Sequence, residues 1–426
     1  MKKIMFIAAL GFFTLNANAQ TKEELKAQKE AQKEAEKQVK KAKDAYEMSI
    51  PNPQYGRKET DFTKLDGAKA LMQEALANPL NASNAQAYGV AADIIKEYYQ
   101  KCDNQIKAGD ESVKGQMLDY AVDLANYSIK FDSLEVLNPK KKENEYKMSH
   151  LKYQGYATNA LITCLQAAQN YSNSDKQDEL KMGYKLSDVV VRGMGKSNLM
   201  SDFTHQEKDN WITFAKAFKA QSVMAIEGSK AEDVEAAYAE LVGTKHEITA
   251  YSALANYFRE KDGTKYMAYL RKGMEKADDA TYPGFAFQLL QYQFNKEELK
   301  DDCLKTIQEI KAKCPDNENT LNAYLMEGQI YFERKQFDKA EALFADAVKK
   351  YPEDDRAISM PAKCAWMKAQ NSSDKKDMQH AIELFKKLEA DYPSKSDLWG
   401  EPLYILYNNV GNMAARDKYK KYYSFK

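Results

Sequence analysis

Gly195, Lys196 and Ser197 are the residues of this sequence that come nearest to a motif with known chemistry. They follow an apolar run in VVVRGMGKSN, residues 189–198, in the way that a phosphate-binding loop follows a strand. Such a loop needs a further glycine five residues before the second one, because its backbone amides must turn onto the phosphate. Val190 occupies that position. We therefore expect a turn between helices here and no nucleotide site.

The remaining reactive side chains lack the spacing that catalysis or metal binding requires. No Cys, His or carboxylate stands at zinc-ligand spacing from any histidine, and the sequence holds neither HExxH nor a GxSxG elbow. Carboxylates alternate with lysines at helical spacing, which is typical of solvated helix faces. The sequence thus predicts no catalytic residue, no metal and no cofactor, and a protein that is not an enzyme. The histidines are His150, His205, His246 and His380.

The cysteines form no disulfide framework. Their number is odd, and no two of them make a CxxC pair. Cys303 and Cys314 are expected on one helix, roughly 16 Å apart at the helical rise per residue, which is too far for a bridge. We predict core thiols at all five positions: Cys102, Cys164, Cys303, Cys314 and Cys364.

The composition favours a helical protein without a strong field. The chain has 426 residues, of which 44% are apolar and 30% charged, with only 18 Gly and 10 Pro. Scarce turn residues and many charges favour helices with solvated outer faces. Because 63 basic residues balance 63 acidic ones, no net charge attracts nucleic acid or an anionic membrane. We expect no nucleic-acid partner.

The first residues predict export. Met1-Lys2-Lys3 is positively charged, Ile4–Leu15 is an apolar run too short to span a bilayer, and Ala17-Asn18-Ala19 resembles a cleavage site. Residues 1–19 are therefore expected to be a cleaved signal peptide. The cleavage point lacks the cysteine that a lipoprotein would carry, so we do not expect a lipoprotein. No later segment is apolar for long enough to span a membrane. The predicted location is the periplasm.

A charged segment and a linker follow the signal sequence. Residues 20–48 are rich in Ala, Glu, Lys and Gln, and pair opposite charges at helical spacing, as in Glu36–Lys40. We expect a leader helix that is solvated along its length, or alternatively a helix for docking or self-association. Residues 49–60, SIPNPQYGRKET, contain the helix breakers of a linker.

The C-terminal part of the chain repeats itself. AEALFADAVKKYP at 340–352, AIELFKKLEADYP at 381–393 and CLKTIQEIKAKCP at 303–315 each place apolar residues at offsets zero, four and seven and a proline at offset twelve. These offsets mark one face of a helix that then stops. A fourth copy begins at Ala415, which is 34 residues after Ala381.

These segments resemble the tetratricopeptide repeat (TPR) family, whose 34-residue unit is a helix-turn-helix. Glu327 departs from the family pattern, because that position usually holds an apolar residue. The resemblance implies an all-α superhelix of about seven or eight helix pairs, with divergent repeats at 61–245 and more regular ones at 246–426, of the exported type of Gram-negative bacteria. The residues that match the pattern in one unit are Leu321, Tyr324, Gly328, Tyr331, Ala340, Phe344, Ala347 and Pro352.

The resemblance also implies a concave groove lined by the first helix of each unit. The family's groove positions fall on aromatic, amide and charged residues, a composition typical of protein-binding surfaces. Aromatic stripes at helical spacing also occur in cores, and Tyr is abundant throughout this chain. The candidate binding residues are Tyr292, Gln329, Phe332, Glu333, Lys363, Trp366, Met367, Tyr404 and Tyr407, and the same carry-over includes Gln288, Asn295, Asn322, Leu325 and Asn408.

Three hypotheses of function follow. The first is a non-enzymatic periplasmic scaffold that binds a protein or peptide partner in its concave face, and it includes an envelope complex as the setting of that partner. The second is a glycan-binding envelope protein of SusD-like type, since aromatic residues stack on sugars. The third is a hydrolase within residues 85–245, for which the sequence offers no motif.

Overall fold

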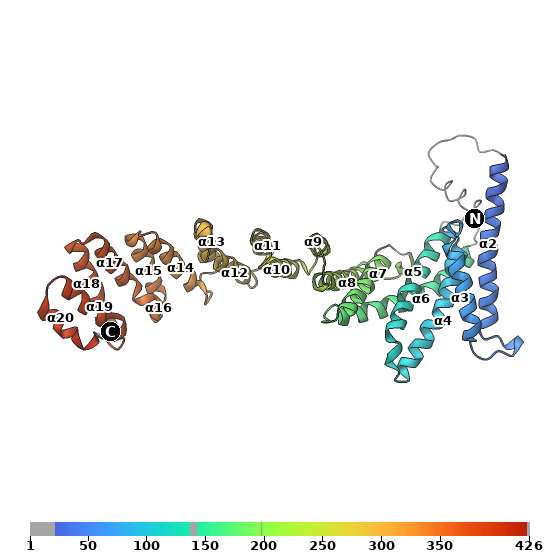
Figure 1. Cartoon of the computed structure of the whole chain (residues 1–426), viewed down its shortest axis with the longest axis horizontal. Helices are drawn as coiled ribbons and strands as arrows, with labels where there is room; N and C mark the ends of the chain where they lie inside the picture. The colour runs from blue at the N-terminus through green and yellow to red at the C-terminus, as the bar shows by residue number, and fades with distance from the viewer. Residues whose placement is uncertain (1–21, 137–142, 197, 424–426) are drawn as a thin grey trace. The chain divides into compact units, whose positions relative to one another are not determined.

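This computed structural model describes residues 22–136, 143–196 and 198–423, and these residues fold into successive α-helices (Figure 1). The described residues contain no β-strand, only an isolated bridge between Asn52 and Arg57. The chain divides into two compact units, one ending at Ala250 and the other beginning at Tyr251. The predicted signal peptide, residues 1–19, lies outside the described residues.

The first unit is built from long helices. Its core runs from Val39 to Ala215 and combines aliphatic side chains with buried aromatic ones such as Tyr98 and Phe131. The helices are α2 (Lys22–Ser49), α3 (Phe62–Ala77), α4 (Ala85–Lys107), α5 (Lys114–Glu135), α6 (Glu143–Tyr171), α7 (Gln177–Lys196), α8 (His205–Ala225) and α9 (Ala231–Ala239).

The second unit is built from shorter helices. Helix α10 (Glu247–Phe258) begins just before the boundary between the units. The helices that follow are α11 (Gly263–Lys276), α12 (Tyr282–Phe294), α13 (Lys300–Lys313), α14 (Thr320–Glu333), α15 (Phe337–Lys350), α16 (Asp355–Ile358), α17 (Met360–Ser372), α18 (Lys375–Asp391), α19 (Ser396–Asn409) and α20 (Met413–Tyr419).

The repeat pattern corresponds to helix pairs whose ends are where the sequence places them. Three helices end two residues before a proline: α13 before Pro315, α15 before Pro352 and α18 before Pro393. A proline cannot continue the backbone hydrogen bonds of a helix, so the chain leaves the helix there. Leaving out the four-residue α16, the described helices form nine successive pairs, with α2 and α3 as the first.

The small residues of the pattern permit close packing of the two helices in a pair. A Cβ atom on Gly328 of α14 would lie 2.6 Å from the ring of Phe344 on α15. Phe344 is 1% exposed, and Ala340 and Ala347 beside it are fully buried. The fold is therefore an all-α solenoid with TPR-like packing, as predicted.

Glu327 departs from the repeat pattern because it belongs to a buried ion pair. Its carboxylate is almost fully buried in α14 and contacts the ammonium group of Lys311 on α13. Gln308 Nε2 donates a second hydrogen bond to Glu327 Oε1 over 2.7 Å. A buried charge is tolerated when it is paired and hydrogen-bonded in this way.

Helix α2 is not solvated along its whole length, which corrects the prediction. Its first turns are exposed, but Ala35, Val39 and Ala42 are fully buried. These three residues face α3 and α4, and Asn81 Nδ2 donates a hydrogen bond to the carbonyl of Ala35 over 3.2 Å. Alanines let the helices approach closely, so that larger residues of α3 supply the apolar area.

The five cysteines and the first two valines of the loop-like run are buried. All five cysteines are free and buried, as predicted. Burial raises the pKa of Cys164 to about 12 and that of Cys303 to about 11. Val189 and Val190 of the loop-like run lie in the core on α7, which ends at Lys196. None of the described helices is long and apolar enough to cross a bilayer.

Candidate functional site

The nine residues predicted to bind a partner all lie in the second unit, each on the first helix of a pair. None is fully buried, and Glu333 and Lys363 are exposed. Tyr292 is on α12; Gln329, Phe332 and Glu333 are on α14; Lys363, Trp366 and Met367 are on α17; Tyr404 and Tyr407 are on α19.

The aromatic members of this set also serve as packing residues. Each ring contacts a second aromatic ring of the same unit, so one side of it is covered, and Trp366 Nε1 is buried. Binding through these residues therefore stays a prediction, in which only their remaining exposed edges are free to contact a partner. The ring centroids are 5.4 Å apart for Phe332–Phe337, 6.1 Å for Trp366–Phe385, 4.3 Å for Tyr404–Tyr423 and 5.8 Å for Tyr407–Tyr419.

Glu333 is held as a carboxylate on this surface. Lys300 Nζ lies 3.2 Å from Glu333 Oε2, and Gln329 Nε2 donates to Glu333 Oε1 over 3.0 Å. Burial would raise the pKa of the Glu333 carboxyl, but these two hydrogen bonds outweigh it and hold the pKa below its usual value. Lys300 also lies 4.0 Å from the ring centroid of Phe294.

A pocket of about 560 Å³ lies beside Tyr292. It is bounded by the turn between α10 and α11 and by one face of α12. Side chains of both charges and several amides line it, so it suits a polar ligand more than an apolar one. Its lining residues are Arg259, Glu260, Lys261, Asp262, Gly263, Tyr266, Gln288, Gln291, Tyr292, Asn295 and Lys296.

Tyr292 packs in this pocket beside a glycine and a second tyrosine. A Cβ atom on Gly263 would come closest to the hydroxyl oxygen of Tyr292, so a larger residue at position 263 would displace the end of that side chain. The rings of Tyr266 and Tyr292 meet edge to face with centroids 4.9 Å apart. Burial raises the pKa of Tyr266, although Arg259 opposes the shift, so the phenol keeps its proton.

The charged residues of the pocket are arranged around the turn. Asp262 is occupied as the cap of α11, because its Oδ1 accepts hydrogen bonds from the backbone amides of Thr264 and Lys265, both over 3.0 Å. Lys296 Nζ lies 4.9 Å from the ring centroid of Tyr292. Arg259 pairs only loosely with Glu260, at 3.8 Å between Nε and Oε1.

Sequence reasoning found one side of this pocket and missed the other. The resemblance to the TPR family implies that Tyr292, Gln288 and Asn295 lie on the groove, and all three line the pocket. Arg259 and Lys261 were missed because they lie just after the end of α10, where no helical period applies. The signal that could have found them is the charged run REKD before a glycine, residues 259–262.

A largely buried carboxylate lies in the first unit, on a helix that carries none of the predicted binding residues. Asp93 on α4 has Lys152 Nζ 2.5 Å from its Oδ1, and Tyr153 donates a hydrogen bond to its Oδ2 over 3.4 Å. Burial raises the pKa of Asp93, while Lys152 and the hydroxyls of Tyr153 and Tyr156 oppose the shift. Burial and the nearby carboxylates raise the pKa of Tyr46 and Tyr156 as well.

His150 has a partner that its sequence spacing did not suggest. Its Nδ1 lies 3.0 Å from Oδ1 of Asp132, on the preceding helix, and Tyr146 OH lies 3.3 Å from the same Asp132 oxygen. Among the described residues, no group of three or more His, Cys, Asp or Glu side chains is placed to hold a metal ion. The His150 pair is therefore a polar contact between α5 and α6.

The comparisons with known proteins found structural neighbours only. No family model and no curated protein match the chain. The crystal structure of yeast Tom70 matches with a TM-score of 0.25 and 14% identity, covering 89% of this chain and 91% of that one. The structure of Naa15/Naa10 bound to HypK-THB matches with a TM-score of 0.24 and 12% identity, covering 84% of this chain and 70% of that one.

At TM-scores this low, the two neighbours carry no argument about fold or function. The solenoid fold stands on the packing within the chain. Gly328 contacts Phe344 within one helix pair, and Gly273 on α11 contacts Phe285 on α12, the first helix of the next pair, where a Cβ would lie within 2.7 Å of three ring atoms.

Proposed function

We propose that this chain is a non-enzymatic scaffold that binds a segment of a protein partner along the second unit. The observation that carries the proposal is the pocket beside Tyr292, because it lies on the same helix series as the other candidate residues. Helix pairs that repeat along the chain present successive first helices as one extended surface. An extended segment can contact such a surface over several repeats.

The chemistry of the surface suits a polar peptide. Gln288 and Asn295 donate their amide N–H groups to backbone carbonyls of their own helix, over 3.0 Å each, so their amide oxygens remain to accept hydrogen bonds from a ligand. Arg259, Lys261 and Lys296 supply donors for carbonyl or carboxylate oxygens. Half-exposed aromatic edges farther along can cover apolar side chains.

Exposed residues give the sharpest test, because truncating the aromatic residues would also disturb packing. Photo-crosslinking amino acids at positions 288, 295 and 363 should capture the same partner from envelope extracts, identified by mass spectrometry. A crosslinker at Lys387, exposed on the second helix of its pair, serves as the control. Equal capture from position 387, or no shared partner among the three groove positions, would remove the proposal.

We also propose that the protein is exported to the periplasm. The motive is the pattern of residues 1–19, a charged start, an apolar run and a small-residue cleavage site. Fractionation of the cells and the intact mass of the purified protein test this. A mature chain that begins at Gln20 and is released with the periplasmic fraction supports export, whereas an intact Met1 in the cytosolic fraction contradicts it.

Glycan binding is the second candidate, and the pocket gives it a specific motive. Three amides, Gln288, Gln291 and Asn295, stand beside the rings of Tyr266 and Tyr292. Amides hydrogen-bond sugar hydroxyls, and aromatic rings pack against sugar faces. Calorimetry with envelope and dietary polysaccharides tests this candidate. Heat that disappears in Asn295→Ala supports it, and no heat with any glycan removes it.

A further inference from the structure

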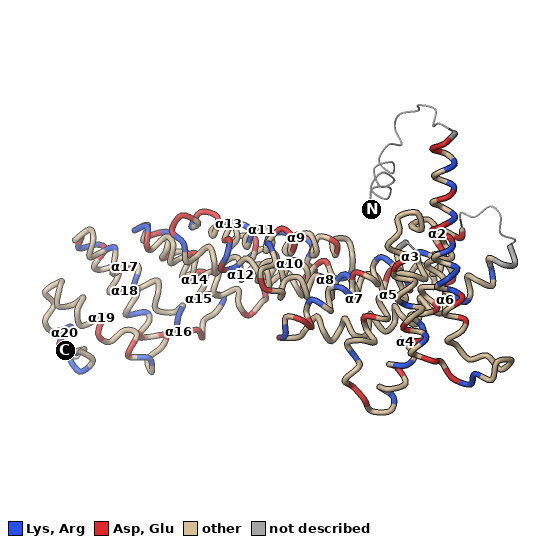
Figure 2. Tube along the Cα trace, turned by 45° about the vertical axis from the view of Figure 1, so that its right-hand side comes forward, with Lys and Arg blue, Asp and Glu red and all other residues tan. Residues whose placement is uncertain are grey.

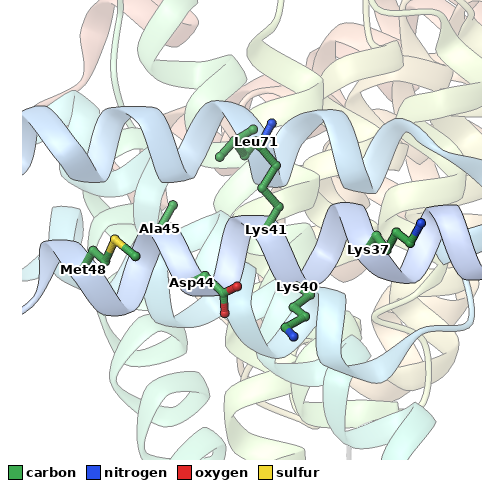
Figure 3. Close-up of a pocket in the computed structure, with 7 residues that line it drawn as sticks. All are labelled: Lys37, Lys40, Lys41, Asp44, Ala45, Met48 and Leu71. Atoms are coloured by element: carbon green, nitrogen blue, oxygen red, sulfur yellow. The ribbon is translucent and has the colours of Figure 1, made fainter.

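A furrow of about 380 Å³ runs along the first unit between α2 and α3 (Figure 3). Its residues from α2 follow the spacing of a single helical stripe, and one residue of α3 faces them. Figure 3 shows Lys41 and Leu71 meeting between the two helices, with Lys37 toward one end of α2 and Met48 toward the other. The lining residues are Lys37, Lys40, Lys41, Asp44, Ala45, Met48 and Leu71.

The floor of the furrow is apolar and partly open to solvent. Met48 is 60% exposed, which is unusual for a methionine on a helix that buries its opposite stripe. Ala45 and Leu71 are half-buried beside it. A Cβ on Gly67, one helical turn before Leu71 on α3, would meet no atom within 4 Å, so no side chain covers the backbone at that position. Apolar side chains of a partner can therefore lie along this floor.

The rim of the furrow is basic. Lys37 pairs with Glu34 at 3.2 Å, but within the described residues Lys40 and Lys41 have no carboxylate at ion-pair distance. Asp44 is the single acidic residue that lines the furrow. Lysine stems can lie along apolar surface while their ammonium groups stay in water, so both cations can reach a ligand above the floor.

The shape and charge together select an acidic amphipathic helix. From Lys37 to Met48 the stripe is about 16 Å long at the helical rise per residue, which corresponds to three turns of a docked helix. The chain already uses this mode of packing, since α2 and α3 stack their other faces on α4. An apolar helix face in a hydrophobic furrow is a common recognition mode, and lysines at the rim favour Glu or Asp at its edges.

We propose that the furrow between α2 and α3 docks an acidic amphipathic helix of a partner protein. The proposal is independent of the partner-binding surface on the second unit. Because the attraction combines apolar contact with charge, binding weakens with salt but does not vanish.

The test uses the purified chain and an 18-residue synthetic helix with Leu on one face and Glu elsewhere. Fluorescence anisotropy should show binding to this peptide and none to a scrambled peptide of the same composition. Lys40→Glu with Lys41→Glu should weaken binding about tenfold, and Met48→Asp should do the same. The control pair Lys26→Glu and Lys29→Glu changes the same charge on the exposed first turns of α2 and should leave binding intact.

Each alternative occupant has its own readout. Circular dichroism confirms that α2 remains helical in all variants, so that loss of binding is not loss of fold. If the Glu peptide binds no better than its scrambled form, or if the control pair weakens it equally, the proposal fails. It also fails if anionic phosphatidylglycerol vesicles bind through Lys40 and Lys41 while the peptide does not. Self-association that disappears in Met48→Asp would assign the furrow to a second copy of the chain and overturn the proposal in the same way.

Discussion

Asp93 shows at the scale of one residue how a buried charge makes folding depend on pH. Its pKa is raised chiefly by burial, so the folded protein disfavours the ionised form. A raised pKa means that the stabilising contribution is complete below the unfolded pKa of about 3.9 and is lost as the pH rises through the folded pKa. At neutral pH the ionised carboxylate therefore lowers the free energy of unfolding.

Asp93→Asn should consequently gain stability relative to the wild type as the pH rises from about 4 to 7. The amide can still accept from Tyr153, and the half-exposed Lys152 can reach water once its partner is neutral. Urea unfolding at several pH values measures the difference.

The matched control is Asp278→Asn. Hydrogen bonds from Thr281 lower the pKa of Asp278, so that variant should lose stability at neutral pH and match the wild type in acid. If the free energies of unfolding of Asp93→Asn and the wild type change in parallel with pH, the ionised Asp93 does not destabilise the folded protein.

At the scale of the helix, the sequence predicts the pairing of helices best where both helices of a pair are short enough to lie within one 34-residue repeat. Helices α13, α14 and α15 have 14 residues each, so a 34-residue unit contains a pair and its turns, and the offsets are visible. Helices α4 and α6 have 23 and 29 residues, which stretches the period and hides the repeat. Their existence could be predicted from apolar periodicity, but their pairing could not.

The candidate site could be predicted only in part, for similar reasons. Tyr292 and Asn295 follow a helical register that the sequence displays, whereas Lys261 takes its place in the pocket from a turn. The burial of α2 was missed because an alanine stripe carries little hydrophobic signal of its own. The larger residues of α3, such as Leu65 and Met72, belong to the core cluster that includes Val39 and Ala42 of α2.

Gly328 gives a prediction at the scale of the helix pair. Alanine is normally better than glycine inside a helix by about 0.5–1 kcal/mol. At Gly328 the added methyl would press on the ring of Phe344, so Gly328→Ala should destabilise the protein by about 1–3 kcal/mol instead. Gly155 on α6 has no atom within 4 Å of a built Cβ, so Gly155→Ala should stabilise. Chemical denaturation of both variants compares the signs, and a stabilised Gly328→Ala would show that the two helices are not in close contact.

At the scale of the whole chain, the charge is balanced along the helices as well as in total. Figure 2 shows both signs interspersed along α2 and the helices of both units. Many of the ion pairs are exposed and join residues three or four apart on one helix, such as Lys107–Asp103, so each adds little to stability. Stability must then come from packing within each unit, such as the cluster that runs from Val39 to Ala215 in the first unit and the one that runs from Ile358 to Tyr419 in the second.

The three tryptophans allow the stability of each unit to be measured separately. Trp211 lies in the first unit, and Trp366 and Trp399 lie in the second, so Trp→Phe variants leave a fluorescence reporter in one unit at a time. Phe385 is fully buried in the second unit, and Phe385→Ala should cost about 3–5 kcal/mol. Because repeat stability is a sum of local and nearest-neighbour terms, the loss should lower the urea midpoint of the Trp399 reporter far more than that of Trp211. Leu161→Ala in the first core should give the reverse order. Equal shifts of both reporters in both variants would mean that the chain unfolds as one cooperative body, with energetic coupling that reaches beyond neighbouring repeats.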